Sequence, residues 1–175
     1  APPDIGTATI AVKHPQFVNL ARDPLTSQTA AVQRLPYKQG SRQADNSGAI
    51  VWPPLHGPNC FWGYLYNKHN NTRTAVIQLG YPVEDQQKGQ APHQQGEYVI
   101  FEKGSIFQQA EAGIHLVTGA IWKKYLSLGA ESSILGYPIS ASRTVAGRKA
   151  YIQSFQSGFI SWSPATGAHE VHGLI

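Results

Sequence analysis

The chain has 175 residues, 41% hydrophobic and 14% charged, so it can bury one core or a short array but has no room for an additional catalytic domain of ordinary size. Its formal charge of +4 comes from basic residues scattered singly, apart from Lys123 and Lys124, which argues against a nucleic-acid partner. The abundant polar, Gly and Pro residues are typical of a secreted protein, and no apolar run is long enough to span a membrane.

Residues 1–47 are expected to form a capping segment or a degenerate repeat. The Ala-Pro-Pro start fits a mature end left by signal-peptide cleavage, although a tag-cleaved chain would look similar. Ile5–Val12 is apolar and β-branched, which predicts a strand that pairs with the edge of the array. Thr29–Leu35 is compatible with a short helix ended by Pro36.

Three glycine triplets in the rest of the chain share a spacing of nine and then six residues, which predicts a repeat of roughly 55 residues. The triplets are Gly48, Gly57 and Gly63; Gly104, Gly113 and Gly119; and Gly158, Gly167 and Gly173. Strands are predicted at 49–52, 105–108 and 159–162, each opened by the first glycine. The equivalent residues Ile50, Ile106 and Ile160 on these strands are expected to be buried in the core.

The second glycine of each triplet is expected to close a β-hairpin, because glycine adopts the positive φ that the chain reversal needs. In the middle copy, the run AIWKKYLSLG predicts a short helix with Ile121, Tyr125 and Leu128 on one face and Gly129 capping its C-terminus. The matching run of the first copy, YLYNKHNNTRT, has poorer helix formers, and no helix is predicted there.

A second repeated motif is the loop Leu79-Gly80-Tyr81-Pro82, which recurs as Leu135-Gly136-Tyr137-Pro138. A glycine before an aromatic residue and a proline predicts a fixed bend, with an extended residue ahead of the proline. Each loop leads through a polar segment into an aromatic strand that ends at Phe101 or Phe155.

The combination of LGYP, F-x-x-G-x-I-x-W and SPATGAHEVHG-x-I is similar to the LGFP repeat of secreted and cell-envelope proteins. The third copy (135–175) matches nearly throughout, the second (79–134) has the run QQAE in place of Trp-Ser-Pro, and the first (48–78) matches from Gly48 onward. The resemblance implies a cell-wall-associated domain, arranged in longer members as a propeller-like ring. The expected fold is therefore mostly β with short helices, a propeller-like array of about three β-hairpin units in one compact domain.

Aromatic and histidine side chains at repeated positions are candidates for ligand binding, because sugar rings stack on Trp and Tyr while polar neighbours bond their hydroxyls. They are Trp52 and Trp162, Tyr81 and Tyr137, and His115 and His169. The alternative is that the rings are packing contacts between copies and that the histidines are solvated. A glycan site is expected where a loop of one copy faces a hairpin of the next.

Four acidic residues are the candidates for glycoside hydrolysis, which needs two carboxylates at a set separation. They are Glu84, Asp85, Glu97 and Glu102, and nothing in the sequence fixes any two of them across a cleft. Cys60 is interpreted as a buried, inert thiol because its neighbours are apolar. No metal site is predicted at His169 and His172, which lie three apart on a probable strand and so point to opposite faces.

Two functions are consistent with these patterns, and neither calls for a cofactor. The first is a secreted, non-catalytic module that binds peptidoglycan or another cell-wall polysaccharide. The second is a small secreted cell-wall hydrolase, muramidase-like, that uses a carboxylate pair. An oligomer that completes a ring between chains is compatible with both.

Overall fold

The computed structural model describes residues 33–34, 41–44, 48–52, 57, 59–71, 78–90, 92 and 95–173. The chain divides into two compact units, which we describe separately. The first unit comprises Ala1–Gln86 with Ile100–Glu102, and the second comprises Gln87–Val99 with Lys103–Ile175. The predicted strand Ile5–Val12 lies outside the described residues.

The first sheet has the order β1-β2-β3-β4 and is antiparallel, with strands Gln33–Arg34, Ser41–Ala44, Gly48–Trp52 and Asn59–Trp62. Ile50 pairs with Cys60 across β3 and β4, and both side chains are buried, as predicted. The helix prediction for Thr29–Leu35 is wrong at Gln33 and Arg34, which form β1 and pair with β2. Strand pairing at these two residues overrides a local helix preference that was weak from the start.

Helix α2 (Gly63–Asn71) follows β4, so the expectation of no helix here is wrong. Its Asn and His residues are poor helix formers, but Leu65 and Tyr66 are buried and the helix packs against β3 and β4. The Phe61 ring on β4 meets the rings of Tyr66 and His69 edge to face, at 5.6 and 5.3 Å between centroids. Tertiary packing therefore stabilises a helix that propensity alone would not.

The second sheet has the order β5-β6-β7-β8, formed by Gln87–Lys88, Gly96–Phe101, Gly104–Gln109 and Gly113–Thr118. The third has the order β12-β11-β10-β9, with β9 at Arg143–Thr144, β10 at Tyr151–Phe155, β11 at Gly158–Ser163 and β12 at Gly167–His172. In the described residues none of the three sheets closes on itself. The mostly β class with short helices is thus confirmed.

The hairpin prediction is also confirmed. Residues of β7 pair with β8 and residues of β11 pair with β12 around turns closed by Gly113 and Gly167, whose φ angles are +87° and +77°. Ile106 and Ile160 are fully buried on the first strand of each hairpin.

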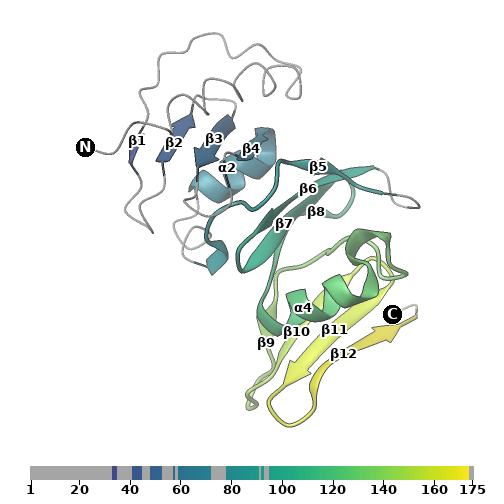
Figure 1. Ribbon diagram of the computed structural model, residues 1–175. Coiled ribbons are helices and arrows are strands. Elements are labelled where there is room, and N and C mark those ends of the chain that lie inside the picture. The colour runs from purple at the N-terminus through teal and green to yellow at the C-terminus, as the bar shows by residue number, and fades with distance from the viewer. Residues whose placement is uncertain are drawn as a thin grey trace. The chain divides into compact units, whose positions relative to one another are not determined.

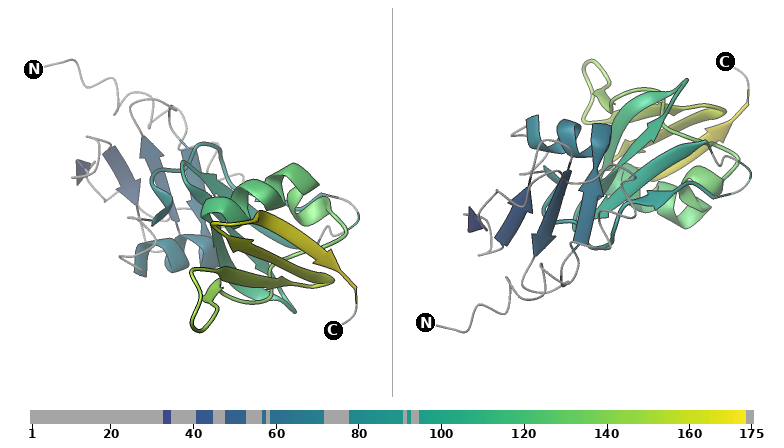
Figure 2. Two further views of the ribbon diagram at one scale, coloured as in Figure 1. Left: turned by 90° about the horizontal axis from the view of Figure 1, so that it is seen from below. Right: turned by 90° about the horizontal axis from the view of Figure 1, so that it is seen from above.

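Helix α4 (Gly119–Leu128) is the helix predicted in the middle copy. It buries Ile121, Trp122 and Tyr125, and Gly129 ends it in the left-handed conformation, as predicted. The helix lies across one face of the third sheet, next to β11 and β12 (Figure 1). Figure 2 shows the same arrangement of α4 on these strands from two further sides. A short 3-10 helix, η1 (Ala130–Ser132), follows α4.

The core of the second unit is a cluster of aromatic rings centred on Phe107. Its ring centroid lies 5.4 Å from that of Tyr125 and 6.2 Å from that of Tyr137. Tyr125 in turn lies 4.6 Å from Phe155. Residues of α4, the LGYP loop and strands of two copies thus share one core within this unit.

Candidate functional site

Both LGYP loops are clamped to the strand end that follows them in the same copy. In the second copy, Pro82 forms a β-bridge with Phe101, and the Tyr81 N–H donates to Glu102 Oε2 at 3.2 Å. The Glu102 N–H donates back to the Tyr81 carbonyl at 2.9 Å. Gly80 has a φ of +74°, and a Cβ on it would collide with the Glu102 side chain.

The third copy reproduces each of these contacts. Pro138 bridges to Phe155, the Tyr137 N–H donates to Gln156 Oε1 at 2.8 Å, and the Gln156 N–H donates to the Tyr137 carbonyl at 3.0 Å. Gly136 has a φ of +68° and lies against the Gln156 side chain. The motif therefore encodes a bend whose glycine is required by backbone conformation and by close approach.

The two loop tyrosines, which the sequence makes ligand candidates, point inward. Tyr81 is 4% exposed and Tyr137 is 1% exposed. The Tyr137 ring lies against Gly96 at the start of β6, where a Cβ would collide with the ring and with the Gln108 carbonyl. The Tyr137 ring of the third copy thus packs on the second copy, and both loop rings are buried.

Trp162, by contrast, lies beside an exposed aromatic partner that the sequence analysis missed. Tyr151 on β10 pairs directly with Trp162 on β11, and their rings stack with centroids 5.7 Å apart and planes 30° apart. Tyr151 is 43% exposed and Trp162 is half-buried. We call these two residues the aromatic pair. Trp52 lies in β3, and its side chain is outside the described residues.

His115 and His169 occupy equivalent places in their hairpins. His115 Nε2 lies 2.8 Å from the Ala112 carbonyl and His169 Nε2 lies 2.6 Å from the Thr166 carbonyl, three residues earlier in each case. Because a carbonyl only accepts, Nε2 must carry the hydrogen in both rings. The histidines close their turns, and the Nδ1 atoms are the ring nitrogens available to a ligand.

The four acidic candidates differ in their surroundings. Asp85 Oδ1 accepts the Cys60 N–H at 2.9 Å and lies 3.3 Å from its Sγ, while Glu102 accepts the Tyr81 N–H. Glu84 is exposed, and Glu97 pairs with Lys88 across β5 and β6. Cys60 is fully buried, as predicted.

A fifth acidic residue, Glu131 in η1, is buried and was not among the candidates. Its Oε1 accepts the backbone N–H of Gln90 at 3.2 Å. Burial raises the pKa of Tyr125, and the Glu131 carboxylate raises it further. The Tyr125 hydroxyl therefore stays protonated and donates to the Gly136 carbonyl at 2.7 Å.

Two neighbouring polar pockets lie in the second unit. The first, which we call the Tyr137 pocket, has a volume of about 200 Å³ and is lined by Pro92, Gln95, Gln109, Glu111, Tyr137 and Gln156. The second, of about 300 Å³, shares Gln95 and Gln109 with it and adds Lys88 and Glu97 among its lining residues. Sequence reasoning missed the glutamines because isolated amides carry no spacing signal.

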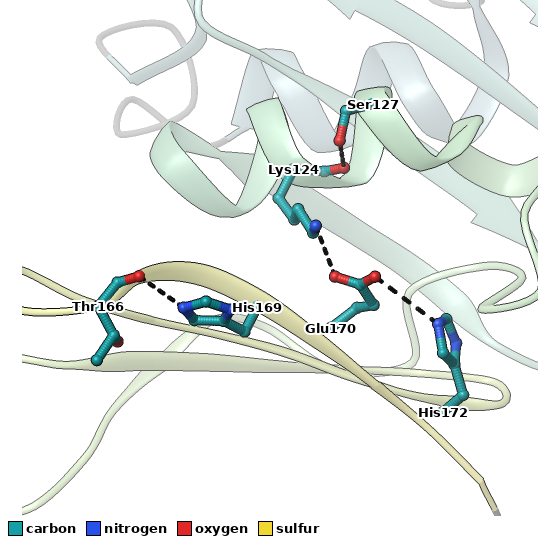
Figure 3. Close-up of polar contacts among 6 residues, drawn as sticks. All are labelled: Lys124, Ser127, Thr166, His169, Glu170 and His172. Atoms are coloured by element: carbon teal, nitrogen blue, oxygen red, sulfur yellow. Dashed lines mark hydrogen bonds and ion pairs between the residues drawn. The ribbon is translucent and has the colours of Figure 1, made fainter.

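Charged contacts at the C-terminal strand link it to α4. Lys124 Nζ lies 2.6 Å from Glu170 Oε2, and Glu170 Oε1 lies 4.0 Å from His172 Nε2 (Figure 3). His169 pairs with Ser161 and lies on the other face of β12, as the sequence predicts. The described residues contain no group of three or more His, Cys, Asp or Glu side chains arranged to hold a metal.

None of the helices that the structure describes has the length and apolar content to cross a membrane. In comparisons with known proteins, the profile of the LGFP repeat matches residues 79–133 and 135–175, which together make up more than half of the chain. These segments coincide with the second and third predicted copies to within one residue. A search of curated proteins found no matching sequence.

Proposed function

The chain belongs to the LGFP repeat family, and we propose that it is a secreted, non-catalytic module that binds peptidoglycan or another cell-wall polysaccharide. The observation that carries the proposal is the aromatic pair of Tyr151 and Trp162. Of the aromatic positions that the sequence nominates, Trp162 combines a described, partly exposed ring with a second exposed ring stacked beside it. The propeller-like ring of copies and any oligomer remain expectations.

The geometry of the pair suits a sugar. Tyr151 and Trp162 are directly opposite on antiparallel strands, so the backbone pairing fixes their Cβ atoms a few ångströms apart. Two rings held in one orientation offer a large apolar contact at low conformational cost, while the indole N–H and phenol O–H donate to hydroxyls at the edge. Glycan binding requires no other chemistry.

The positions of the candidate acids support binding over hydrolysis. Asp85 and Glu102 accept backbone N–H groups and so hold the β4 strand and the first LGYP loop in place. A general acid or nucleophile must instead reach the scissile bond from within a cleft. Of the four candidate acids, Glu97 is the one that lines either polar pocket.

Co-sedimentation of the full chain with insoluble peptidoglycan, and with other wall polysaccharides, tests the proposal. Trp162→Ala and Tyr151→Ala are expected to weaken binding by about 1–3 kcal/mol each, as for aromatic stacking on nucleobases. Tyr64→Ala is the matched control, because Tyr64 is 68% exposed and lies on α2 in the first unit. Reducing ends measured in the same tube should not increase. Their release, abolished by one carboxylate change, would establish the hydrolase instead.

A further inference from the structure

Two basic side chains adjoin the aromatic pair, in the turn that joins β9 to β10. The turn is tight, because the Val145 N–H donates to the Ala150 carbonyl at 2.9 Å and the Arg148 N–H donates to the Val145 carbonyl at 3.1 Å. Arg148 and Lys149 are both exposed. The turn therefore presents two cations directly before the strand that begins with Tyr151.

These cations lie in a part of the sequence that has no acidic residue to balance them. Residues 132–169 contain three basic residues and no Asp or Glu. Neither Arg148 nor Lys149 forms an ion pair within the part of the chain that the structure describes. The next acidic residue, Glu170, has its Oε2 atom 2.6 Å from Lys124 Nζ. The surface beside the aromatic pair is therefore positive and attracts an anion.

The second copy shows on which side of the sheet Lys149 lies. The repeat aligns three residues of the second copy with Tyr151, Trp162 and Lys149, which are, in the same order, Glu97, Gln108 and Gln95. These three counterparts line one pocket of about 300 Å³. The Gly89 N–H donates to the Gly96 carbonyl at 2.8 Å, so the loop of Gln95 is closed by the same bond as the turn of Lys149. The shared register therefore places Lys149 beside the aromatic pair.

Arg143 is a third basic residue of the same hairpin, but it lies on the other face of the sheet. It pairs with Ile152, whereas its neighbour Thr144 pairs with Tyr151. Successive residues of a strand point to opposite faces, so Thr144 shares the face of the aromatic pair and Arg143 does not. Arg143 thus provides an exposed charge in the same hairpin that lies away from the aromatic pair.

Stacked rings beside cations fit a sugar that carries a negative charge. Lys and Arg bind carboxylate and phosphate groups through charge-assisted hydrogen bonds, and Arg can do so through two donors at once. We propose that the aromatic pair binds an acidic glycan, with a sugar ring on the pair and a carboxylate or phosphate group of the glycan bound by Lys149 and Arg148. This inference rests on the proposed glycan-binding function and names the class of glycan.

Isothermal titration calorimetry of the full chain with three tetrasaccharides of one backbone tests the inference. Chitotetraose is neutral, a peptidoglycan tetrasaccharide without stem peptides carries lactyl carboxylates, and phosphorylated chitotetraose carries phosphate. We expect an acidic tetrasaccharide to bind about fivefold more tightly than chitotetraose at low salt, the effect of roughly one exposed ion pair. High salt should remove this difference by screening. The acidic ligand with the higher affinity identifies the anion.

Three substitutions locate the charge that matters. Lys149→Gln gives the third copy the residue type of the second, and it should weaken binding of the acidic tetrasaccharide about two- to threefold, as should Arg148→Gln. The double variant should bind the acidic tetrasaccharide no more tightly than chitotetraose. Melting temperatures should match the wild type, because both side chains are exposed. Arg143→Gln is the matched control, since it removes one charge from the same hairpin and should leave all three affinities unchanged.

The outcomes separate this inference from the proposed function. If all three tetrasaccharides bind equally and Trp162→Ala weakens binding of each, the acidic preference is wrong and the proposed function stands. If Arg143→Gln weakens acidic binding as much as Lys149→Gln does, the preference reflects net charge and the assigned contacts are wrong. A preference that survives in the double variant also overturns them. If no tetrasaccharide and no insoluble wall glycan binds, the proposed function is wrong and the inference fails with it.

Discussion

The two LGYP loops have the same backbone contacts but different side-chain partners. In both, the proline forms a β-bridge with a phenylalanine, and the tyrosine N–H donates to the side chain of the residue after that phenylalanine. That side chain is Glu102 in the second copy and Gln156 in the third. The clamp therefore requires only an acceptor oxygen at this position.

Glu102 and Gln156 differ in which side-chain atoms remain free to bond after the tyrosine N–H has found its acceptor. A carboxylate has only acceptor atoms, whereas an amide that has engaged its oxygen still offers an NH₂ group. Gln156 also lines the Tyr137 pocket, so in the third copy an NH₂ donor remains on a residue of the pocket wall. The two copies therefore share the hydrogen bond that holds the loop, and they differ in whether an NH₂ donor remains after it has formed.

The largest expected effect is on stability, from removing the ring at the bridge in either copy. Phe101→Ala and Phe155→Ala should each cost about 3–5 kcal/mol, because both rings are buried and large cavities relax only partly. Thermal unfolding followed by circular dichroism measures this. An unchanged melting temperature for one variant would show that the two phenylalanines do not contribute equally to stability.

Gly136→Ala is expected to cost about 1–2 kcal/mol for the left-handed backbone and more for the contact with Gln156. Gly147→Ala is the matched control, since Gly147 has a similar φ of +70° but open space around its Cβ position. Chemical denaturation gives the loss of unfolding free energy for each variant, and the difference between the two losses is the cost of the contact with Gln156. Equal losses would mean that the Gln156 side chain moves aside freely.

Gln156→Ala should cost about 1–3 kcal/mol, because it leaves the Tyr137 N–H without its acceptor. Gln156→Glu should lose much less at neutral pH, because it reproduces the clamp of the second copy. Denaturant unfolding of both variants measures the difference. Similar losses would show that the amide NH₂ also stabilises the fold.

The smallest expected effect concerns Glu170, whose pKa is held below its usual value of 4.5 mainly by the hydrogen bond from Lys124. A carboxyl with a lowered folded-state pKa stabilises the protein above its unfolded pKa, and this is lost as pH falls through the folded value. Glu170→Gln should therefore be slightly less stable than wild type at pH 7. The difference in unfolding free energy between the variant and the wild type should shrink toward pH 3. A difference that does not change with pH would exclude the ion pair as its source.

The repeated hairpins, the isoleucine core and α4 could be predicted from the sequence because fixed glycine spacing and local periodicity encode them. Helix α2 could not, since its residues disfavour a helix and its packing against β3 and β4 stabilises it. The strand at Gln33–Arg34 was missed because it is defined by its pairing with Arg42 and Ser41 of β2, which the local residue preferences do not reveal.

The candidate site was predicted only in part. Trp162 follows from its repeat position, but Tyr151 becomes its partner through strand register, which a single sequence does not specify. The repeat position of Tyr81 and Tyr137 does not distinguish a buried ring from an exposed one. The expected placement of a glycan site between a loop of one copy and a hairpin of the next stays a prediction.

The central claim, glycan binding at the aromatic pair, is tested most directly through the indole N–H signals of the four tryptophans in the full chain. Each signal is assigned by substitution and followed during titration with soluble wall-glycan fragments. We expect the Trp162 signal to shift progressively and to lose its response in Tyr151→Ala. Binding of the fragments with the Trp162 signal unchanged would contradict the account.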